Sequence, residues 1–303
     1  MPDIEIKIVD SVYAKIFCDK SISREMSDFF TFKVPNYKYH PAYRNKMWDG
    51  QIRLYNLHKK TLYVGLIPYV LQFAFDRNYT VDSEYKIKEK LKPEDVKKFI
   101  DDVIKPTVSG EYIIPHDHQL DAINHAINHE RCLLLSATGS GKSLIIYSLI
   151  RYYLSILPKE SKILVIVPTT NLVSQMFSDF EDYSSKSDWS VKKNCYKIYQ
   201  GKDKQTNKRV VISTWQSIYK MPEKYFDQFG AIFGDECHLF KSKSLTTLMT
   251  KLIDCPYRVG TTGTLDGTFT HKLVIEGLFG RVYNVTSTKK LIDKSLLSEL
   301  EIE

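Results

Sequence analysis

The segment Ala137–Ser143 (ATGSGKS) limits the possible folds of this chain more than any other part of its sequence. It directly follows an apolar run, CLLLS, and directly precedes SLIIYSLIRYYLSIL, whose apolar residues have helical spacing. Small residues let backbone N–H groups converge on one anion, and the start of a helix adds the positive end of its dipole. The segment therefore predicts a phosphate-binding loop, in which Lys142 would contact the β- and γ-phosphates of ATP and the Ser143 hydroxyl would ligate Mg²⁺. Ser136 departs from the strict GxxxxGKS/T pattern, which has glycine at that position.

From residue 111 onward, short apolar runs alternate with stretches of helical spacing. The apolar runs are CLLLS, KILVIVP, KIYQ, RVVIST, AIFGDE and YRVGTT. Strands that are apolar on both faces and alternate with helices indicate a parallel sheet covered by helices on both sides. Ligands of such sheets bind at the carboxyl ends of the strands. We therefore predict an α/β domain over residues 111–285, with its site at that edge of the sheet.

A second polar cluster, Asp235-Glu236-Cys237-His238, directly follows the apolar run AIFG. Polar residues after a strand would ordinarily mark only the start of a loop. In a chain with a phosphate-binding loop, however, an acid at a strand end is suited to hold Mg²⁺, and this role falls to Asp235. The neighbouring Glu236 could polarise the attacking water as a general base. The predicted catalytic residues are therefore Lys142, Asp235 and Glu236.

Taken in order, these segments resemble the motifs of the superfamily 2 helicases over about residues 115–285. The phosphate loop fits AxxGxGKS/T, with Ser136 at the alanine position, and DECH fits the DExH box. The resemblance implies a RecA-like fold, ATP and Mg²⁺ as cofactors, and recognition of adenine by Gln119. The residues that it assigns to the nucleotide are Gln119, Thr138, Gly139, Ser140, Gly141, Lys142 and Ser143, with Ser143 and Asp235 at the metal.

The resemblance extends to segments that line the nucleic-acid track in this family. Pro168–Leu172 with Gln175 resembles motif Ia, and Ser213–Ser217 resembles the motif Ib region. Thr262–Thr264 (TGT) stands where the family has Ser/Thr-Ala-Thr, and Thr262, Thr264 and His238 would couple the nucleotide to the strand. The residues implied to contact nucleic acid are Thr169, Thr170, Asn171, Gln175, Thr214 and Gln216.

Residues 1–82 have the pattern of a separate, small α+β module. Alternation of apolar residues predicts strands at 4–9 and 12–18, SISREMSDFF predicts a helix at 23–30, and QIRLYNLHKKTLYVG has the pattern of a β-hairpin. LIPYVLQFAFDRN has apolar residues at helical spacing, at 67, 70, 71, 74 and 75. Residues 83–110 are polar and charged, so we predict a connector with one helix in KPEDVKKFIDDVI.

Basic residues concentrate in this first module. The whole chain has 43 Lys+Arg and 36 Asp+Glu, a net charge of +7. Between residues 31 and 60, however, seven basic residues are opposed by Asp49 alone. Because cations bind phosphates and aromatic rings stack on bases, we predict that Lys38, Arg44, Lys46 and Trp48 contact DNA. A solvated basic face over a small packed core is the alternative explanation.

DECH and TGT differ from the DEAD and SAT motifs of the DEAD-box RNA helicases and favour DNA remodellers and restriction-type motors. The block KMWDGQIRLYN and the segment TLYVGLIPYVLQFAFDRNY resemble the region that precedes the motor in phage recombination helicases. The resemblance implies ATP-dependent unwinding or migration of branched DNA, such as forks and recombination junctions. Two alternatives stay open: an RNA or RNA–DNA hybrid helicase, and a DNA-binding protein that ATP switches without strand separation.

Superfamily 2 motors bind ATP between two RecA-like domains, and the second supplies arginines. Arginine fingers contribute roughly 10³- to 10⁵-fold in rate where they have been measured. Residues 286–303 resemble the start of a linker to such a domain. We therefore expect an N-terminal part of a longer motor, which binds ATP weakly and barely hydrolyses it alone.

The five cysteines are scattered and include no CxxC pair, which argues against a disulfide framework and a structural zinc. Apolar runs stay well short of the roughly 18 to 20 residues that a membrane span needs. MPDIEIKIVD lacks the layout of a signal peptide. We expect a monomeric protein without a membrane partner, located in the cytoplasm, and in that of a bacterial host if the chain is phage-encoded.

Overall fold

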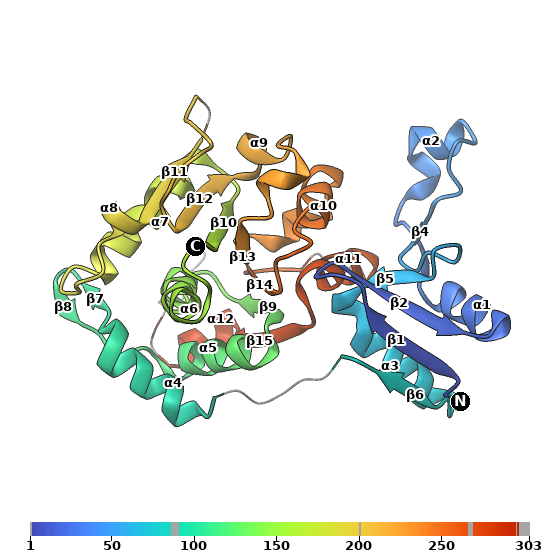
Figure 1. Cartoon of the computed structure of the whole chain (residues 1–303), viewed down its shortest axis with the longest axis horizontal. Helices are drawn as coiled ribbons and strands as arrows, with labels where there is room; N and C mark the ends of the chain where they lie inside the picture. Colours follow the sequence, from blue (N-terminus) through green and yellow to red (C-terminus); the bar gives the residue numbers. More distant parts are fainter. Residues whose placement is uncertain (1, 86–90, 200, 266–268, 295, 297–303) are drawn as a thin grey trace, which may run out of the picture.

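The computed structural model describes residues 2–85, 91–199, 201–265, 269–294 and 296, apart from the side chains of Lys241 and of residues 269–271. Two sheets with their own helices contain most of these residues (Figure 1). A four-stranded sheet lies in the N-terminal part of the chain, and a seven-stranded sheet lies in the part that follows.

The N-terminal sheet has the strand order β5-β2-β1-β6. Strand β1 pairs antiparallel with β2 and parallel with β6, and β2 pairs antiparallel with β5. Its alternate residues are buried against two amphipathic helices, α1 and α3. The bounds of these elements are β1 Ile4–Ile8, β2 Tyr13–Cys18, α1 Lys20–Phe29, β5 Thr61–Tyr63, α3 Ile67–Asp76 and β6 Val81–Ser83, with a 3₁₀ turn η2 at Val64–Leu66.

Three predictions for this region need correction. The first helix begins at Lys20, with Asp19 as its N-cap, and so starts before the predicted residue 23. The predicted hairpin in residues 51–65 is wrong, because its two strands join different sheets and share only the bridge between Asn56 and Thr61. On α3 the buried aromatic residue is Phe73, whereas Phe75 is 78% exposed.

A two-stranded ribbon, β3 (Thr31–Lys33) with β4 (Gln51–Arg53), extends from this module. Residues 34–50 connect the two strands and contain the 3₁₀ turn η1 (Tyr37–Tyr39) and the short helix α2 (Pro41–Arg44). Figure 1 shows that this segment stands away from both sheets. We call residues 31–53 the arm.

The connecting segment packs against the second sheet. Helix α4 (Pro93–Phe99) begins with proline, as predicted, and continues as a π-helical turn, η3 (Ile100–Ile104). Val96, Ile100 and Ile104 are buried in the core of the second sheet. A short hairpin of β7 (Thr107–Val108) and β8 (Glu111–Tyr112) follows.

All seven strands of the second sheet run parallel, in the order β11-β12-β10-β13-β14-β9-β15. This confirms the predicted α/β fold, while the edge strand β15 was missed in the sequence. The strand bounds are β9 Arg131–Ser136, β10 Lys162–Val167, β11 Cys195–Ile198, β12 Val210–Thr214, β13 Phe229–Gly234, β14 Tyr257–Thr262 and β15 Val282–Thr286.

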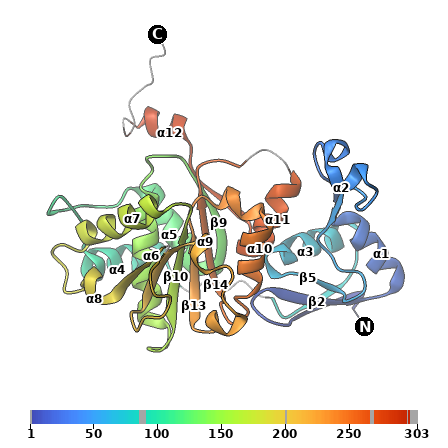
Figure 2. The same ribbon diagram turned by 90° about the horizontal axis from the view of Figure 1, so that it is seen from above.

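Helices cover both faces of this sheet (Figure 2). One face packs against α5, α6 and α7, and the other against α10 and α11. The helix bounds are α5 Asp117–His129, α6 Lys142–Ile156, α7 Thr170–Tyr183, α8 Val191–Asn194, α9 Trp215–Ile218, α10 Lys243–Thr250, α11 Phe269–Phe279 and α12 Thr288–Asp293, with 3₁₀ turns η4 at Glu223–Tyr225 and η5 at Cys237–Lys241.

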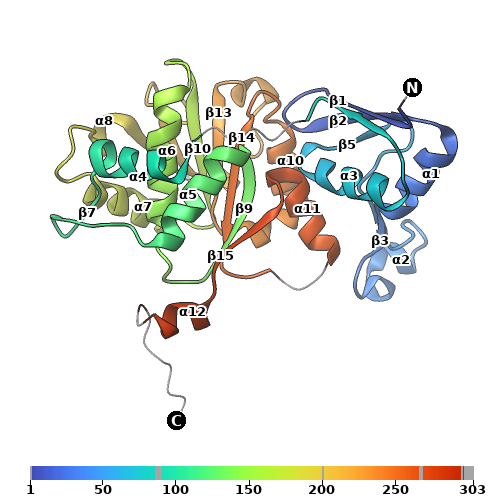
Figure 3. The same ribbon diagram turned by 90° about the horizontal axis from the view of Figure 1, so that it is seen from below.

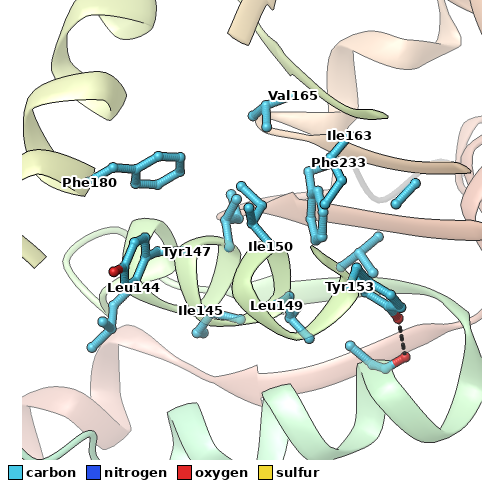
Figure 4. Packing of buried hydrophobic residues seen from close by; sticks show 14 of the residues in the cluster. Leu144, Ile145, Tyr147, Leu149, Ile150, Tyr153, Ile163, Val165, Phe180 and Phe233 are labelled. Atoms are coloured by element: carbon cyan, nitrogen blue, oxygen red, sulfur yellow. Dashed lines mark hydrogen bonds between the residues drawn. The ribbon is translucent and has the colours of Figure 1, made fainter. Parts of the chain in front are cut away.

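Helix α6 lies at the centre of the larger core and is buried along most of its length (Figure 4). Tyr147 and Tyr153 are fully buried on it, and the Tyr153 hydroxyl donates a hydrogen bond to the Ala126 carbonyl oxygen at 3.3 Å. Because α6 begins at Lys142, its packing fixes the position of the phosphate-binding loop.

Helix α11 joins the two modules (Figure 3). Leu273 and Val274 belong to the hydrophobic core of the N-terminal module, although they follow the second sheet's strand β14 in the chain. The Tyr69 hydroxyl donates a 2.6 Å hydrogen bond to the buried carboxylate of Glu276. A Cβ atom on Gly65 would lie 2.0 Å from the Glu276 carbonyl oxygen, so the backbones touch here. The two modules are therefore packed against each other.

Of the five cysteines, four are buried and Cys18 is half-buried, and all are free thiols. Among the described residues, no helix is both long and apolar enough to cross a bilayer.

Candidate nucleotide site and nucleic-acid groove

The phosphate-binding loop connects β9, which ends at Ser136, with α6, which begins at Lys142. Gly139 and Gly141 have φ values of 80° and 79°, a left-handed conformation that glycine adopts without steric cost. A Cβ atom at Gly141 would also lie 2.2 Å from the Gln119 side-chain nitrogen. Two of the small residues are therefore required by the conformation of the loop.

Gln119, on the first turn of α5, is hydrogen-bonded to the backbone of this loop. Its Oε1 accepts a hydrogen bond from the His116 backbone N–H at 2.9 Å, and its Nε2 donates to the Ser140 carbonyl oxygen at 3.0 Å. The His118 ring nitrogen lies 3.1 Å from the same carbonyl oxygen. Both ends of the Gln119 amide thus bind protein atoms, and adenine recognition by this residue stays a prediction.

A cavity of about 390 Å³ opens between the loop, α7 and the end of β13. The ammonium nitrogen of Lys142 lies 3.6 Å from Glu236 Oε1 across it. The residues that line the cavity are Thr138, Gly139, Gly141, Lys142, Ser143, Ile146, Leu172, Gln175, Met176, Asp179, Asp235 and Glu236.

Asp235 and Ser143 supply oxygen atoms to this cavity. Burial raises the pKa of the Asp235 carboxyl, and a 2.9 Å hydrogen bond from the Thr261 hydroxyl partly opposes that rise. The Ser143 hydroxyl is 2.8 Å from the Tyr183 hydroxyl. Carboxylate and hydroxyl oxygens are hard ligands of the kind that Mg²⁺ takes in proteins, so this pair fits the predicted metal.

His238 connects the Asp-Glu pair with the end of β14. Its Nδ1 lies 3.2 Å from Glu236 Oε2 and 3.1 Å from the Thr262 hydroxyl. The Thr262 hydroxyl donates its own proton to the Thr264 carbonyl oxygen at 2.9 Å, so Nδ1–H must be the donor toward Thr262. Glu236 itself has φ 51°, a conformation that is strained for a residue with a Cβ atom. A continuous polar chain therefore runs from Lys142 to Thr264.

The strand order explains why these residues meet. Strand β14 lies between β9 and β13. Its carboxyl end therefore lies between the phosphate loop, which follows β9, and the Asp-Glu pair, which follows β13. Thr262 closes β14 and therefore faces both segments at the carboxyl edge. Residues far apart in the sequence are thus neighbours because parallel strands end at one edge.

A second groove, of about 590 Å³, opens at the same edge beyond β10. Four residues predicted to contact nucleic acid line it together, namely Thr169, Thr170, Thr214 and Gln216. Tyr199 and Lys204, in the loop after β11, also line it and were not predicted. Lys204 lies in the basic stretch GKDK, which matches no helicase motif and so did not indicate a place in this groove.

Two predicted nucleic-acid residues lie elsewhere. Gln175 lines the phosphate cavity, because it shares one face of α7 with Leu172 and Asp179, at helical spacing. Asn171 is exposed on the first turn of α7 beside the groove but does not line it.

On the arm, Lys38, Arg44, Lys46 and Trp48 line one surface hollow of about 580 Å³. The Trp48 indole nitrogen donates a 2.8 Å hydrogen bond to the Gln51 carbonyl oxygen, which fixes the ring. The structure thus brings the four predicted contact residues of this module together.

A parallel sheet of this strand order, with a phosphate loop after one strand and an Asp-Glu pair after another, defines the RecA-like ATPase domain of a superfamily 2 motor. Comparison with known proteins agrees with this class and narrows it. Residues 112–267 match the family of the Type III restriction enzyme res subunit, and residues 3–84 match the N-terminal family of DNA helicase UvsW. The chain belongs to the UvsW-like superfamily 2 helicases.

Individual relatives support this membership. The chain is 33% identical to the ATP-dependent DNA helicase UvsW of Enterobacteria phage T4 over 99% of its own length. It is 23% identical over 71% of its length to the DNA 3′-5′ translocase XPB2 of Sulfurisphaera tokodaii. A crystal structure of the UvsW helicase from bacteriophage T4 superposes with a TM-score of 0.84 at 33% identity, covering 93% of this chain and 99% of that one. The predicted family and RecA-like fold are confirmed.

The chain covers only part of these relatives. It spans 59% of the length of the T4 helicase and 46% of the length of the Sulfurisphaera translocase.

Proposed function

We propose that this chain is the ATP-binding part of a DNA helicase or translocase that acts on branched DNA, such as forks and recombination junctions. One observation carries the proposal: the polar chain Lys142–Glu236–His238–Thr262 connects the phosphate cavity with the residues at the end of β14. Such a chain gives ATP a physical route to the ends of β13 and β14, and β13 is the strand next to β10, beyond which the groove opens. As a relative of a phage enzyme, the chain would act as a monomer in the cytoplasm of a bacterial host.

In this proposal each residue of the cavity has a distinct role. The backbone of residues 138–141 and the Lys142 ammonium group bind the phosphates. Glu236 accepts the proton of the attacking water, and the neighbouring Asp235 with Ser143 holds Mg²⁺. When bound, Mg²⁺ would neutralise charge on the phosphate oxygens. Gln119 would position the loop and, where the base reaches it, adenine.

The groove beyond β10 is the proposed track for one DNA strand. Its lining offers hydroxyl and amide groups, with Lys204 and Tyr199 at one side. Hydroxyl and amide groups bind phosphates without reading the sequence of bases, as a translocating motor requires. His238 and Thr262 would transmit the state of the phosphate cavity to this track, with Thr264 as the next group in the chain.

Hydrolysis by this chain alone is proposed to be slow. Among the described residues that line the phosphate cavity, Lys142 is the one cation. An arginine from a second RecA-like domain would add transition-state stabilisation worth roughly 10³- to 10⁵-fold in rate. Rapid turnover by the purified chain would contradict this part of the proposal.

Replacing Gly141 with Ala tests the nucleotide site, because its matched control lies in the same chain. Gly141 and Gly110 have φ values of 79° and 77°, so alanine is strained at both positions. At Gly110 nothing lies within 4 Å of the added Cβ, whereas at Gly141 the Gln119 amide is 2.2 Å away. We expect Gly141→Ala to weaken MgATP binding at least ~10-fold, because the loop must move away from its phosphate-binding geometry.

The measurement is a titration with a fluorescent ATP analogue, with a thermal melt of each variant to verify folding. Gly110→Ala should bind the nucleotide like the parent chain. If Gly141→Ala folds and also binds like the parent, the phosphates lie somewhere other than in this loop and the proposed function loses its basis.

A further inference from the structure

Two large apolar side chains at the end of the arm are almost fully exposed. Tyr39 is 80% exposed and Met47 is 81% exposed. They lie on either side of α2, one in η1 and one just after the helix. Figures 1 and 3 show that this end of the arm stands away from both sheets, which agrees with the exposure of the two side chains.

The segment that carries them is held in one conformation by its own contacts. The rings of Tyr37 and Tyr43 meet edge to face at 4.7 Å, and those of His40 and Trp48 do so at 5.3 Å. A Cβ atom at Gly50 would lie 2.3 Å from the Tyr37 ring, so the closing turn packs directly on that ring. These rings contact one another while Tyr39 and Met47 are exposed to solvent, and a preorganised display of this kind lowers the entropy cost of binding.

The backbone at Lys46 adds a second, independent observation. Helix α2 ends with a hydrogen bond from the Met47 N–H to the Ala42 carbonyl oxygen at 2.8 Å, and Lys46 has φ 55°. Glycine is the usual residue at this position of a helix end, because a Cβ atom is strained there. Lysine at this position therefore places a cation next to Met47 at a conformational cost.

The charges around the two side chains are those of a site for a polyanion. A lysine directly precedes each of them, Lys38 before Tyr39 and Lys46 before Met47. The nearby acid, Asp49, forms an ion pair with Arg53 at the base of the arm. Within the part of the chain that the structure describes, Lys38, Arg44 and Lys46 form no ion pair.

We propose that the end of the arm binds nucleobases that are unstacked at a DNA branch point. Tyr39 and Met47 contact the faces of the bases, and Lys38 and Lys46 contact the phosphates on either side. Aromatic rings stack on bases of any sequence, and methionine is among the side chains that proteins insert between base steps. In a fully stacked duplex such a face is reached only after base steps are unstacked, which costs free energy, whereas a branch point exposes it already. The inference rests on the proposed function and deepens it, because it assigns the recognition of the branch to named residues.

The test is binding of the purified chain to a forked duplex and to a linear duplex of the same length. Tyr39→Ala and Met47→Ala should each weaken fork binding by about 5-fold or more, since each removes a base contact. Both should change binding to the linear duplex much less. Phe75→Ala is the matched control, because Phe75 is 78% exposed in the same module but is followed by Asp76 and has no lysine beside it. It should leave both affinities unchanged.

Lys46→Gly separates a functional role of this lysine from a structural one. Glycine relieves the strain at φ 55°, so the melting temperature should stay the same or rise. Fork binding should nevertheless weaken, and the slope of log K against log salt should fall by about 1, because one phosphate contact is lost. Tyr39→Ala should leave that slope unchanged.

The inference is overturned if Tyr39→Ala and Met47→Ala weaken fork binding no more than Phe75→Ala. It is also overturned if they weaken fork and linear duplex equally, since the end of the arm would then contact ordinary duplex. Unchanged fork binding in all arm variants, with a loss of binding to a protein partner instead, would assign the surface to protein. In each of these cases a parent chain that still prefers the fork leaves the proposed function standing. A parent chain without that preference contradicts the proposed function itself.

Discussion

Replacing Glu236 with Gln is expected to slow ATP hydrolysis by about 10²- to 10⁴-fold while leaving MgATP affinity nearly unchanged. Glutamine keeps the size of the side chain and keeps an oxygen near His238 Nδ1, which lies 3.2 Å from Oε2 in the parent chain. It cannot accept a proton from water. Lys142, 3.6 Å from Oε1 in the parent chain, stays available to the phosphates.

The rate is measured in single turnover, with the chain in excess over labelled ATP and with forked DNA present. Glu223→Gln, on an exposed 3₁₀ turn outside the cavity, is the control and should hydrolyse ATP like the parent. Hydrolysis by Glu236→Gln at the parent's rate would show that Glu236 is not the base. A large loss of MgATP affinity would instead point to a role for Glu236 in binding.

The second large effect is expected on stability, at Arg258. This side chain is fully buried at the start of β14 and donates hydrogen bonds to four backbone carbonyl oxygens. Two of these oxygens, of Met249 and Leu252, lie at and just beyond the carboxyl end of α10, where each also accepts a long 3.4 Å hydrogen bond from a backbone N–H. Arg258→Met keeps the length of the side chain and removes all four hydrogen bonds of the guanidinium group. We expect the free energy of unfolding to fall by about 3 to 5 kcal/mol.

Urea denaturation, followed by circular dichroism, measures this loss. Arg24→Met, at an exposed position on α1, is the control and should change the free energy of unfolding by less than about 0.5 kcal/mol. A loss below about 1 kcal/mol for Arg258→Met would mean that water or rearranged backbone replaces the guanidinium group.

Burial lowers the pKa of this guanidinium group, and burial likewise lowers that of Arg131 on the adjacent strand, to about 9. Arg131 donates to the Ser11 carbonyl oxygen of the N-terminal module at 2.8 Å. Strand β9 thus begins at the buried Arg131, which contacts the N-terminal module, and ends at the phosphate loop. Strand β14 has the buried Arg258 as its second residue and ends at Thr262. The same two strands connect the interface between the modules with the proposed nucleotide site.

The nucleotide site could be predicted from the sequence because its geometry is local or follows from the sheet. The phosphate loop depends on a few neighbouring residues between a strand and a helix, and both elements have clear periodicity. The proximity of Lys142 and Glu236 could be predicted because parallel strands end at one edge of a sheet. The coupling role of His238, Thr262 and Thr264 was implied by family resemblance, and the structure adds the contacts of His238 with Glu236 and Thr262.

Other features depend on tertiary packing that local patterns do not contain. The segment at 51–65 has the composition of a hairpin, but Leu54 and Tyr55 are buried in the N-terminal core and separate its strands into two sheets. Gln175 follows the groove motif in sequence, yet the helical period of α7 directs it to the phosphate cavity. Lys204 carries no motif and joins the groove only through the fold. The exposure of Tyr39 and Met47 likewise could not be predicted from the sequence, because large apolar side chains are more often packed than exposed.

The most direct test of the central claim is binding of this chain to a forked duplex, a linear duplex and single-stranded RNA at one fixed salt concentration. We expect the chain to bind the fork most tightly. Replacing Lys38, Arg44 and Lys46 with Ala should reduce this preference. Equal or tighter binding of RNA, unaffected by those three substitutions, would contradict the central claim. The chain would then belong to an RNA motor, and its N-terminal module would be a scaffold.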